Sequence, residues 1–270
     1  MDFQNLQEIG TAIQARHIAV PLERALTTTR SERAHVLQDV LEARGFDFAP
    51  VLEGRHVVGL IDKSSAAAAV THVGECLRPL EEDLLVSDAT PVAQLFQFMS
   101  QEPFLFVVSQ RRISGFVTTA DLGSSPVRTH FYLLLAASEM AMARLVRREF
   151  PDQQRAIELL SERRIAHHVQ LIGELRQSDE LLDDVAALSF GDLVSICGQN
   201  EPLKAWMTAN GRSFKTSTKG LALFRNDVMH PVRQFTDGSP QRVSRLADYD
   251  RNLCHLVRGV NQQLAPSRSS

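Results

Sequence analysis

The feature that most constrains the fold of this chain is a gapless internal repeat with an offset of 56 residues. SERAHV from Ser31 aligns with SDATPV from Ser87, and FAPVLEGRHVVGLI from Phe48 aligns with FLFVVSQRRISGFV from Phe104. Each copy contains a strand, a helix and then two apolar strands joined by a short polar turn. The repeat predicts helices at 36–43 and 92–99 and hairpin turns at 53–54 and 110–111. Two copies predict a paired domain, because a solenoid would need more repeats.

The second half of the chain has a different periodicity. From Arg128 onward strand signals nearly vanish, and apolar residues recur at helical spacing. Residues 129–150 are predicted to form a long helix that Pro151 ends, and residues 152–176 a second one with Asp152 as its N-cap. Shorter helices are predicted at 179–187 and 190–199, then a helix around 223–230 and a last one at 241–264.

These patterns predict an α+β protein with two domains, paired β-α-β-β units at 1–127 and an all-α bundle of five or six helices at 128–270. The first domain is acidic, with 10 Lys and Arg against 16 Asp and Glu, whereas the second holds 19 against 16. Only the second domain is therefore a candidate for contact with a phosphate backbone. The N-terminus has no apolar run typical of a signal peptide or a membrane span, so a cytoplasmic protein without membrane contact is expected.

The second copy of the repeat ends in GFVTTAD, which places a hydroxyl at Thr118 and a carboxylate at Asp121. This ending and the paired units over roughly residues 14–125 resemble the tandem CBS domain, or Bateman module. The resemblance implies clefts for an adenine nucleotide as regulatory ligand, with Asp121 on the ribose hydroxyls and Thr118 near the phosphates. The structural alternative is that Asp121 caps the following helix and Thr118 ends a strand.

The first copy departs from this ending. After Gly59 the sequence reads LIDKSS, which places Asp62 where the hydroxyl belongs and Ser65 where the carboxylate belongs. We therefore expect at most one intact ribose site in the pair.

The stretch LFRNDVMHP concentrates polar chemistry near the end of the chain. Asn226 and His230 are four residues apart, so a helix places them on one face, and Arg225, about 100° away, reaches the same place with its long side chain. Pro231 disfavours the α conformation at His230, so the helix is expected to end there. The structural alternative is a histidine that caps the helix and an arginine that pairs with a neighbouring carboxylate.

Two long helices, a short middle and RNDVMH before a last helix resemble the HEPN superfamily, over roughly residues 128–264. The resemblance implies a metal-independent endoribonuclease with a composite active site at a homodimer interface. It assigns Arg225 as the phosphate clamp, Asn226 as an orienting residue, and His230 as the acid/base or the group that positions the RNA 2′-hydroxyl. The chemistry fits, because histidine titrates in the useful range and arginine offers a fixed planar fork.

No metal site is expected. Cys76, Cys197 and Cys254 lie far apart and form no CxxC pair, and Asp227 is the only acidic residue in LFRNDVMHP. No cofactor is therefore expected for catalysis.

The combined interpretation is a nucleotide-regulated, metal-independent endoribonuclease that acts on RNA as a homodimer. One alternative is a non-catalytic interaction protein that senses an adenine nucleotide, in which Arg225 and His230 would be buried in ion pairs inside one bundle. Another is a HEPN toxin-type member of a two-protein system.

Overall fold

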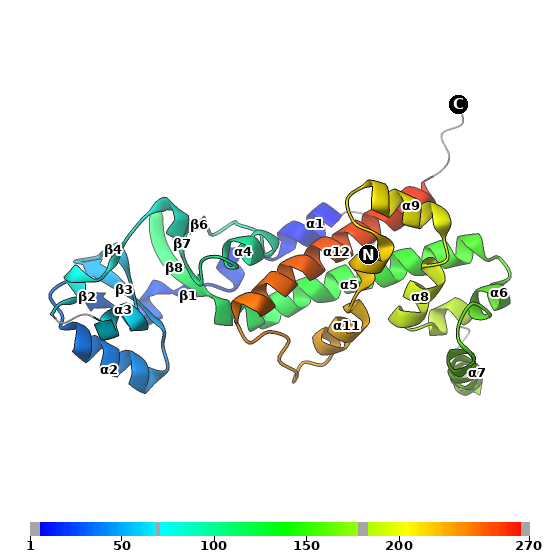
Figure 1. Ribbon diagram of the computed structural model, residues 1–270, viewed down its shortest axis with the longest axis horizontal. Helices are drawn as coiled ribbons and strands as arrows, with labels where there is room; N and C mark the ends of the chain where they lie inside the picture. Colours follow the sequence, from blue (N-terminus) through cyan, green and yellow to red (C-terminus); the bar gives the residue numbers. More distant parts are fainter. Residues whose placement is uncertain (1–5, 69–70, 178–182, 266–270) are drawn as a thin grey trace, which may run out of the picture. The chain divides into compact units, whose positions relative to one another are not determined.

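The structure is a computed structural model that describes residues 6–68, 71–177 and 183–265 (Figure 1). It divides into two compact units. The paired unit comprises Thr11–Val127 and Thr236–Ser244, and the helical unit comprises Arg128–Phe235 and the described residues from Arg245 onward, together with residues 6–10. Within the described ranges, no helix has the length and apolar character needed to cross a membrane.

Residues 236–244 belong to the paired unit, which differs from the boundary predicted at residue 127. This segment contacts the end of the second copy of the repeat. A Cβ built on Gly238 would lie 3.2 Å from Thr119 Oγ1, and one on Gly123 would lie 3.6 Å from Thr236 Cγ2. A boundary drawn from periodicity misses such a contact, because it joins segments that are far apart in the sequence.

Both copies of the repeat fold in the predicted order of strand, helix and hairpin. The first copy contains β2 (Thr28–Thr29), α2 (Ala34–Arg44), β3 (Phe48–Glu53) and β4 (His56–Asp62), and the second contains β6 (Leu85–Ser87), α4 (Val92–Phe98), β7 (Phe104–Ser109) and β8 (Arg112–Thr118). The hairpin turns adopt positive φ, 61° at Gly54 and 47° and 66° at Gln110 and Arg111. Such φ values suit the twist of a tight hairpin. The turn predicted at 110–111 is confirmed, whereas the turn predicted at 53–54 lies one residue later, because Glu53 still belongs to β3.

Shorter elements connect the strands of the paired unit. They are α1 (Leu6–Ala12), which enters it from the helical unit, α3 (Lys63–Ala68), and the 3-10 turns η1 (Ala15–His17), η2 (Leu22–Arg24), η3 (Val73–Glu75), η4 (Glu82–Leu84) and η5 (Thr119–Gly123).

The two sheets exchange their short edge strands. The strand orders are β1-β8-β7-β6 and β2-β3-β4-β5, where β1 is Val20–Pro21 and β5 is Arg78–Pro79. The strand β1, which precedes the first copy, therefore completes the sheet of the second copy. The strand β5, which precedes the second copy, completes the sheet of the first. A glycine permits each approach: a Cβ on Gly59 would lie 2.4 Å from the Arg78 carbonyl oxygen, and one on Gly115 would lie 2.5 Å from that of Val20.

Aromatic side chains pack the two sheets against each other. Phe104 stacks on Phe116 with a centroid distance of 5.1 Å and lies 5.5 Å from Phe48, its counterpart in the first copy. Phe104 and Phe106 are buried together with Leu60 and Leu84. Burial of these apolar side chains in one core holds the two copies together.

The helical unit contains more helices than predicted. Within the described residues these are α5 (Ser125–Glu149), α6 (Gln153–Ile157), α7 (Glu162–Gln177), α8 (Phe190–Cys197), α9 (Glu201–Ala209), α10 (Phe214–Thr218), α11 (Leu221–Met229) and α12 (Pro240–Leu264), with a 3-10 turn, η6, at Asp184–Ala187. The predicted long helices at 129–150 and 241–264 are confirmed as parts of α5 and α12.

The prediction of a single helix at 152–176 is wrong. The structure has two helices, α6 and α7. After α6 the amides of Leu159 and Leu160 donate to carbonyls only three residues back, and α7 begins beyond Ser161, whose carbonyl accepts from Arg164 and Ile165. Asp152 occupies the N-cap position of α6, but its side chain makes no capping hydrogen bond. The helix predicted at 179–187 lies partly outside the described residues, and its remainder is the turn η6.

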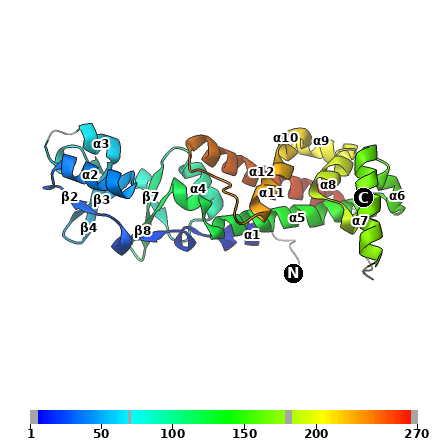
Figure 2. The ribbon, with the colours of Figure 1, turned by 90° about the horizontal axis from the view of Figure 1, so that it is seen from below.

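The helices α5 and α12 run side by side in the same direction (Figures 1 and 2). The buried ring of His130 on α5 lies with Nε2 2.6 Å from Asp250 Oδ1 on α12, and Arg148 donates to the Gln263 carbonyl nearer the other ends. These contacts fix the long helices on which the shorter ones pack.

Candidate functional sites

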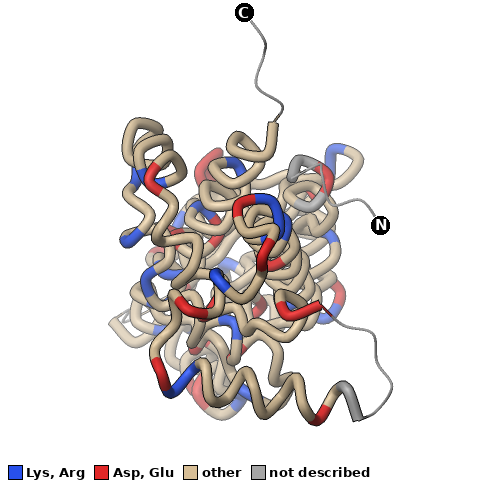
Figure 3. The backbone as a smooth tube through the Cα atoms, turned by 90° about the vertical axis from the view of Figure 1, so that its right-hand side faces the viewer, with Lys and Arg blue, Asp and Glu red and all other residues tan. Residues whose placement is uncertain are grey.

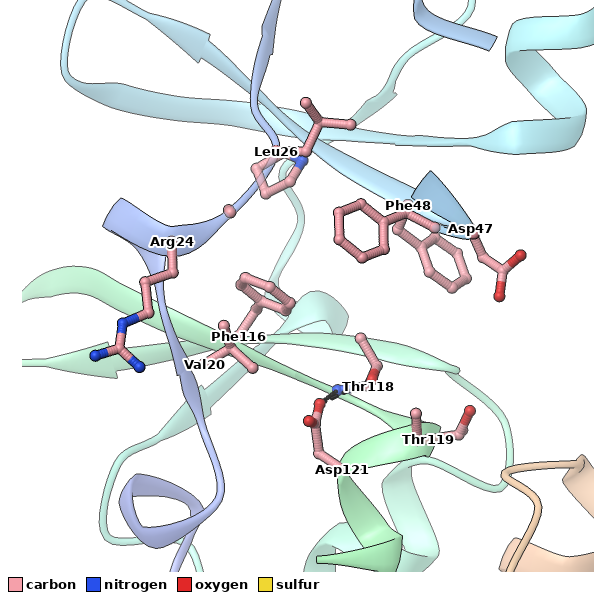
Figure 4. A pocket seen from close by; sticks show the side chains of 14 residues that line it. Val20, Arg24, Leu26, Asp47, Phe48, Phe116, Thr118, Thr119 and Asp121 are labelled. Atoms are coloured by element: carbon pink, nitrogen blue, oxygen red, sulfur yellow. Dashed lines mark hydrogen bonds between the residues drawn. The ribbon is translucent and has the colours of Figure 1, made fainter. Parts of the chain in front are cut away.

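A cavity of about 380 Å³ opens between the two copies of the repeat. Its apolar part is formed by Val20, Leu26, Phe48 and Phe116, whose side chains gather around it in Figure 4. The polar part comes from the end of β8 and from η5, with the side chains Thr118, Thr119 and Asp121. Because aromatic rings face polar groups across it, the cavity suits a ligand with one flat apolar end and one polar end.

Thr118 and Asp121 are brought together at this cavity. Asp121 Oδ2 accepts from the Thr118 amide at 2.7 Å and from Thr118 Oγ1 at 2.8 Å. The carboxylate thus caps η5, as the structural alternative predicts, and it also lines the cavity. Within the described residues Asp121 Oδ1 accepts no hydrogen bond, so one oxygen remains for a ligand.

The corresponding cleft of the first copy has a volume of about 350 Å³ and the opposite arrangement of groups. Here the carboxylate is on Asp62, which accepts from the Ser65 amide at 2.8 Å and from Ser65 Oγ at 2.6 Å. Burial alone would raise the pKa of the Asp62 carboxyl, but hydrogen bonds from Ser64 and Ser65 outweigh burial and hold this pKa below its ordinary value. A negative charge therefore stands where the second copy has a neutral hydroxyl.

An ion pair occupies the same cleft. Arg78 Nη1 donates to Glu102 Oε2 at 2.7 Å, and Arg78 Nη2 contacts both Glu102 and Asp83. The repeat aligns Arg78 with Leu22 and Glu102 with Phe46, so the second copy's cleft has two apolar residues in place of the ion pair, and Phe46 lines the cavity of about 380 Å³. Sequence reasoning missed this pair, although the alignment of the copies contains the signal.

The helix α11 carries the polar stretch predicted as a catalytic site. It ends at Met229, and His230 adopts extended φ and ψ of −104° and 99°, which confirms the end expected before Pro231. The side chains of Asn226 and His230 are exposed. Arg225 Nε donates to Glu139 Oε1 on α5 at 3.3 Å, and the arginine side chain keeps 37% of its surface exposed. Arg225 and His230 are thus accessible to a ligand, although Arg225 has the carboxylate partner that the structural alternative predicts.

Phe224 on α11 and Arg128 on α5 fix the position of α11. Phe224 is buried between Phe131 on α5 and Tyr249 on α12, with centroid distances of 4.9 Å and 4.1 Å. Arg128 Nη1 donates to the carbonyl oxygens of Asp227, Val228 and His230 at 2.6, 2.9 and 3.2 Å. A cation at the C-terminus of a helix satisfies carbonyls that lack helical partners and complements the helix dipole.

A pocket of about 440 Å³ lies beside α11. Arg225 and Asn226 line it from α11, Arg164 lines it from α7, and Ser189 and Asp192 line it from the start of α8. His230 is outside the lining of this pocket. The structure therefore brings Arg225 and Asn226 to one open pocket and leaves His230 one helical turn beyond it. Sequence reasoning missed Arg164, because no local pattern relates it to the stretch on α11.

Charges of both signs are interspersed along the helices (Figure 3). At the pocket beside α11 each arginine is paired with a carboxylate, Arg164 with Asp192 and Arg225 with Glu139. Among the described residues, no group of three or more His, Cys, Asp and Glu side chains is arranged to hold a metal ion.

Comparison with known proteins gives similarities of structure only. Neither a family model nor a curated protein matches the sequence. CBSX2 in complex with AMP is 16% identical, with a TM-score of 0.38, over 43% of this chain and 95% of that chain.

Two other solved structures give similar values. CBS domains of a transcriptional regulator from Streptococcus pneumoniae are 19% identical over 41% and 96% of the two chains, with a TM-score of 0.37. The CBS domain of a bacterial CNNM/CorC family Mg²⁺ transporter in complex with ATP is 16% identical over 43% and 88%, with a TM-score of 0.38.

Proposed function

We propose that the paired unit binds an adenine nucleotide in the cavity of about 380 Å³ and acts as the regulatory part of the protein. The observation that carries this proposal is the combination of three aromatic rings, those of Phe46, Phe48 and Phe116, with the Thr118–Asp121 pair in one cavity. The adenine ring would pack against Phe48 and Phe116. The free Oδ1 of Asp121 would accept from the ribose hydroxyls, with the phosphates toward Thr118.

Isothermal titration of the full chain with AMP and with ATP tests this proposal. Asp121→Asn keeps the shape of the side chain but removes its charge and one acceptor. Affinity is expected to fall by roughly tenfold or more, because hydrogen bonds to charged groups contribute about 1.5–3 kcal/mol. The matched control is Asp39→Asn, which changes an exposed carboxylate of α2 outside the cavity lining. Equal affinities of wild type and Asp121→Asn, or no binding of either nucleotide, would contradict the proposal.

A second function, metal-independent cleavage of RNA by the helical unit, is favoured by the exposure of the groups on α11. Arg225 would stabilise the negative charge that develops on the phosphate, and His230 would take the proton from the 2′-hydroxyl or position this group. Asn226 is on the same helix face as His230 and would orient either group.

Leu223 is 73% exposed and lies two residues before Arg225. An exposed apolar side chain at this place suits contact with a second copy of the chain.

Cleavage of a mixed-sequence single-stranded RNA in EDTA tests this function. His230→Ala is expected to lower the cleavage rate by roughly 10²–10⁴-fold, the usual contribution of a positioned acid or base. His167→Ala is the control, because His167 is an exposed histidine on α7 outside the pocket beside α11. Cleavage that survives in His230→Ala would assign the reaction to another site. An inactive wild type would favour a nucleotide-sensing interaction protein without catalysis.

A further inference from the structure

The pocket beside α11 contains a second arginine for which the proposed cleavage reaction has no role. Arg164 lies on α7 and Arg225 on α11, so two separate helices bring guanidinium groups to one pocket of about 440 Å³. Their side chains are 41% and 37% exposed. Both groups are therefore accessible to a ligand that enters the pocket.

A carboxylate holds each arginine from the side of its Nε atom. Arg164 Nε donates to Asp192 Oδ1 at 2.7 Å, and its Nη2 donates to Asp192 Oδ2 and to Ser189 Oγ. Arg225 Nε donates to Glu139 Oε1 at 3.3 Å. Within the described part of the chain, neither Nη1 of Arg164 nor either Nη atom of Arg225 forms a hydrogen bond. The outer donors of both guanidinium groups are thus available.

The anchor of Arg164 is stable at neutral pH. Asp192 is buried, which alone would raise its pKa, but hydrogen bonds from Arg164 and Ser189 outweigh burial and keep the pKa below its ordinary value. The ionised carboxylate fixes the guanidinium in one orientation. An arginine that is already held loses less conformational freedom when it binds, and its planar fork matches the oxygens of a phosphate.

We propose that Arg164 contacts a phosphate of single-stranded RNA, next to the phosphate that Arg225 contacts. This inference rests on the proposed RNA-cleaving function of α11. Because His230 lies outside the pocket, the pocket holds a part of the strand beside the point of cleavage. Asn226 and Ser195 also line it and supply polar groups to the same segment.

The test uses a short single-stranded RNA with 2′-O-methyl groups at every position, which the full chain can bind but cannot cleave through a 2′-hydroxyl. Affinity is measured by fluorescence anisotropy over a series of salt concentrations. Arg164→Gln is expected to weaken binding and to reduce the slope of log K against log salt by about 0.7, the contribution of one phosphate contact in a single strand. Arg163→Gln is the matched control, an exposed arginine next in sequence and outside the pocket.

Two further measurements separate a phosphate contact from a structural role. Arg164→Lys keeps the positive charge but loses the planar guanidinium. Its slope of log K against log salt is expected to equal that of wild type, with a lower affinity. Inorganic pyrophosphate is added as a competitor, and complete displacement of the RNA at micromolar concentration would assign the pocket to a small phosphate compound instead. A slope unchanged in Arg164→Gln would overturn the inference even if affinity falls, because lost packing alone does not alter the number of phosphate contacts.

The outcome also distinguishes the inference from the function on which it rests. If wild type cleaves unmodified RNA in a reaction that requires His230 and the slope is insensitive to Arg164, only the inference fails. If wild type binds the methylated RNA through Arg164 and does not cleave the unmodified strand, only the catalytic function fails. A wild type that binds no RNA overturns both.

Discussion

Gly115 shows how a single hydrogen atom in place of a side chain permits the paired unit to form. A methyl group there would lie 2.5 Å from the Val20 carbonyl oxygen, so β1 would have to move away from β8. Gly115→Ala is expected to lower the free energy of unfolding by about 1–3 kcal/mol, the usual effect of an overpacked position. Urea denaturation measures this. In the control Gly123→Ala the new methyl group meets its nearest atom at 3.6 Å, an ordinary contact, and a loss as large as that of Gly115→Ala would contradict the explanation.

At the scale of residues, the sequence predicts those site groups that belong to one local pattern. Arg225, Asn226 and His230 are within six residues of one another, and the extended conformation of His230 after the end of α11 follows from Pro231 alone. Arg164 and Arg128 could not be predicted in the same way. Each reaches α11 through tertiary packing, and no sequence spacing contains that information.

At the scale of elements, the hairpins of the repeat were predictable because alternating apolar residues and turns are local signals. The helix at 152–176 was not, because its apolar spacing continues through the break at Ser161. The strands β1 and β5 have only two residues each, and their partners are decided by the packing of the copies. A strand of two residues is too short to show the alternation of apolar and polar residues by which strands are predicted.

The asymmetry of the two clefts leads to a prediction of stoichiometry. Asp62 and the Arg78–Glu102 ion pair occupy the first cleft, so wild type is expected to bind one AMP per chain. A variant with Asp62→Thr, Ser65→Asp, Arg78→Leu and Glu102→Phe gives this cleft the residues of the second and is expected to bind two. Asp62→Thr with Ser65→Asp alone retains the ion pair and should remain at one. Isothermal titration gives the number, and two AMP per wild-type chain would contradict the explanation.

At the scale of the whole molecule, regulation requires that the nucleotide and the RNA affect each other's binding. If AMP changes the affinity for 2′-O-methyl RNA, the same RNA must change the affinity for AMP by the same factor, typically about 5–150-fold. Anisotropy and titration measure the two factors independently. In Asp121→Asn, the AMP concentration that produces half of this effect is expected to rise by roughly tenfold or more, while binding of RNA alone stays as in wild type. Unchanged affinities in both directions would show that the units bind their ligands independently.

The exchange of β1 and β5 has a consequence for how this protein can be divided. Neither copy of the repeat is a self-contained module, since the edge of each sheet is supplied by the segment that precedes the other copy. To transplant the second copy into another chain, one would have to carry Val20–Pro21 with it and leave behind the first copy that lies between them. A single copy moved without the other would lack the edge strand of its sheet, so the pair has to be moved as one piece although its sequence contains two units.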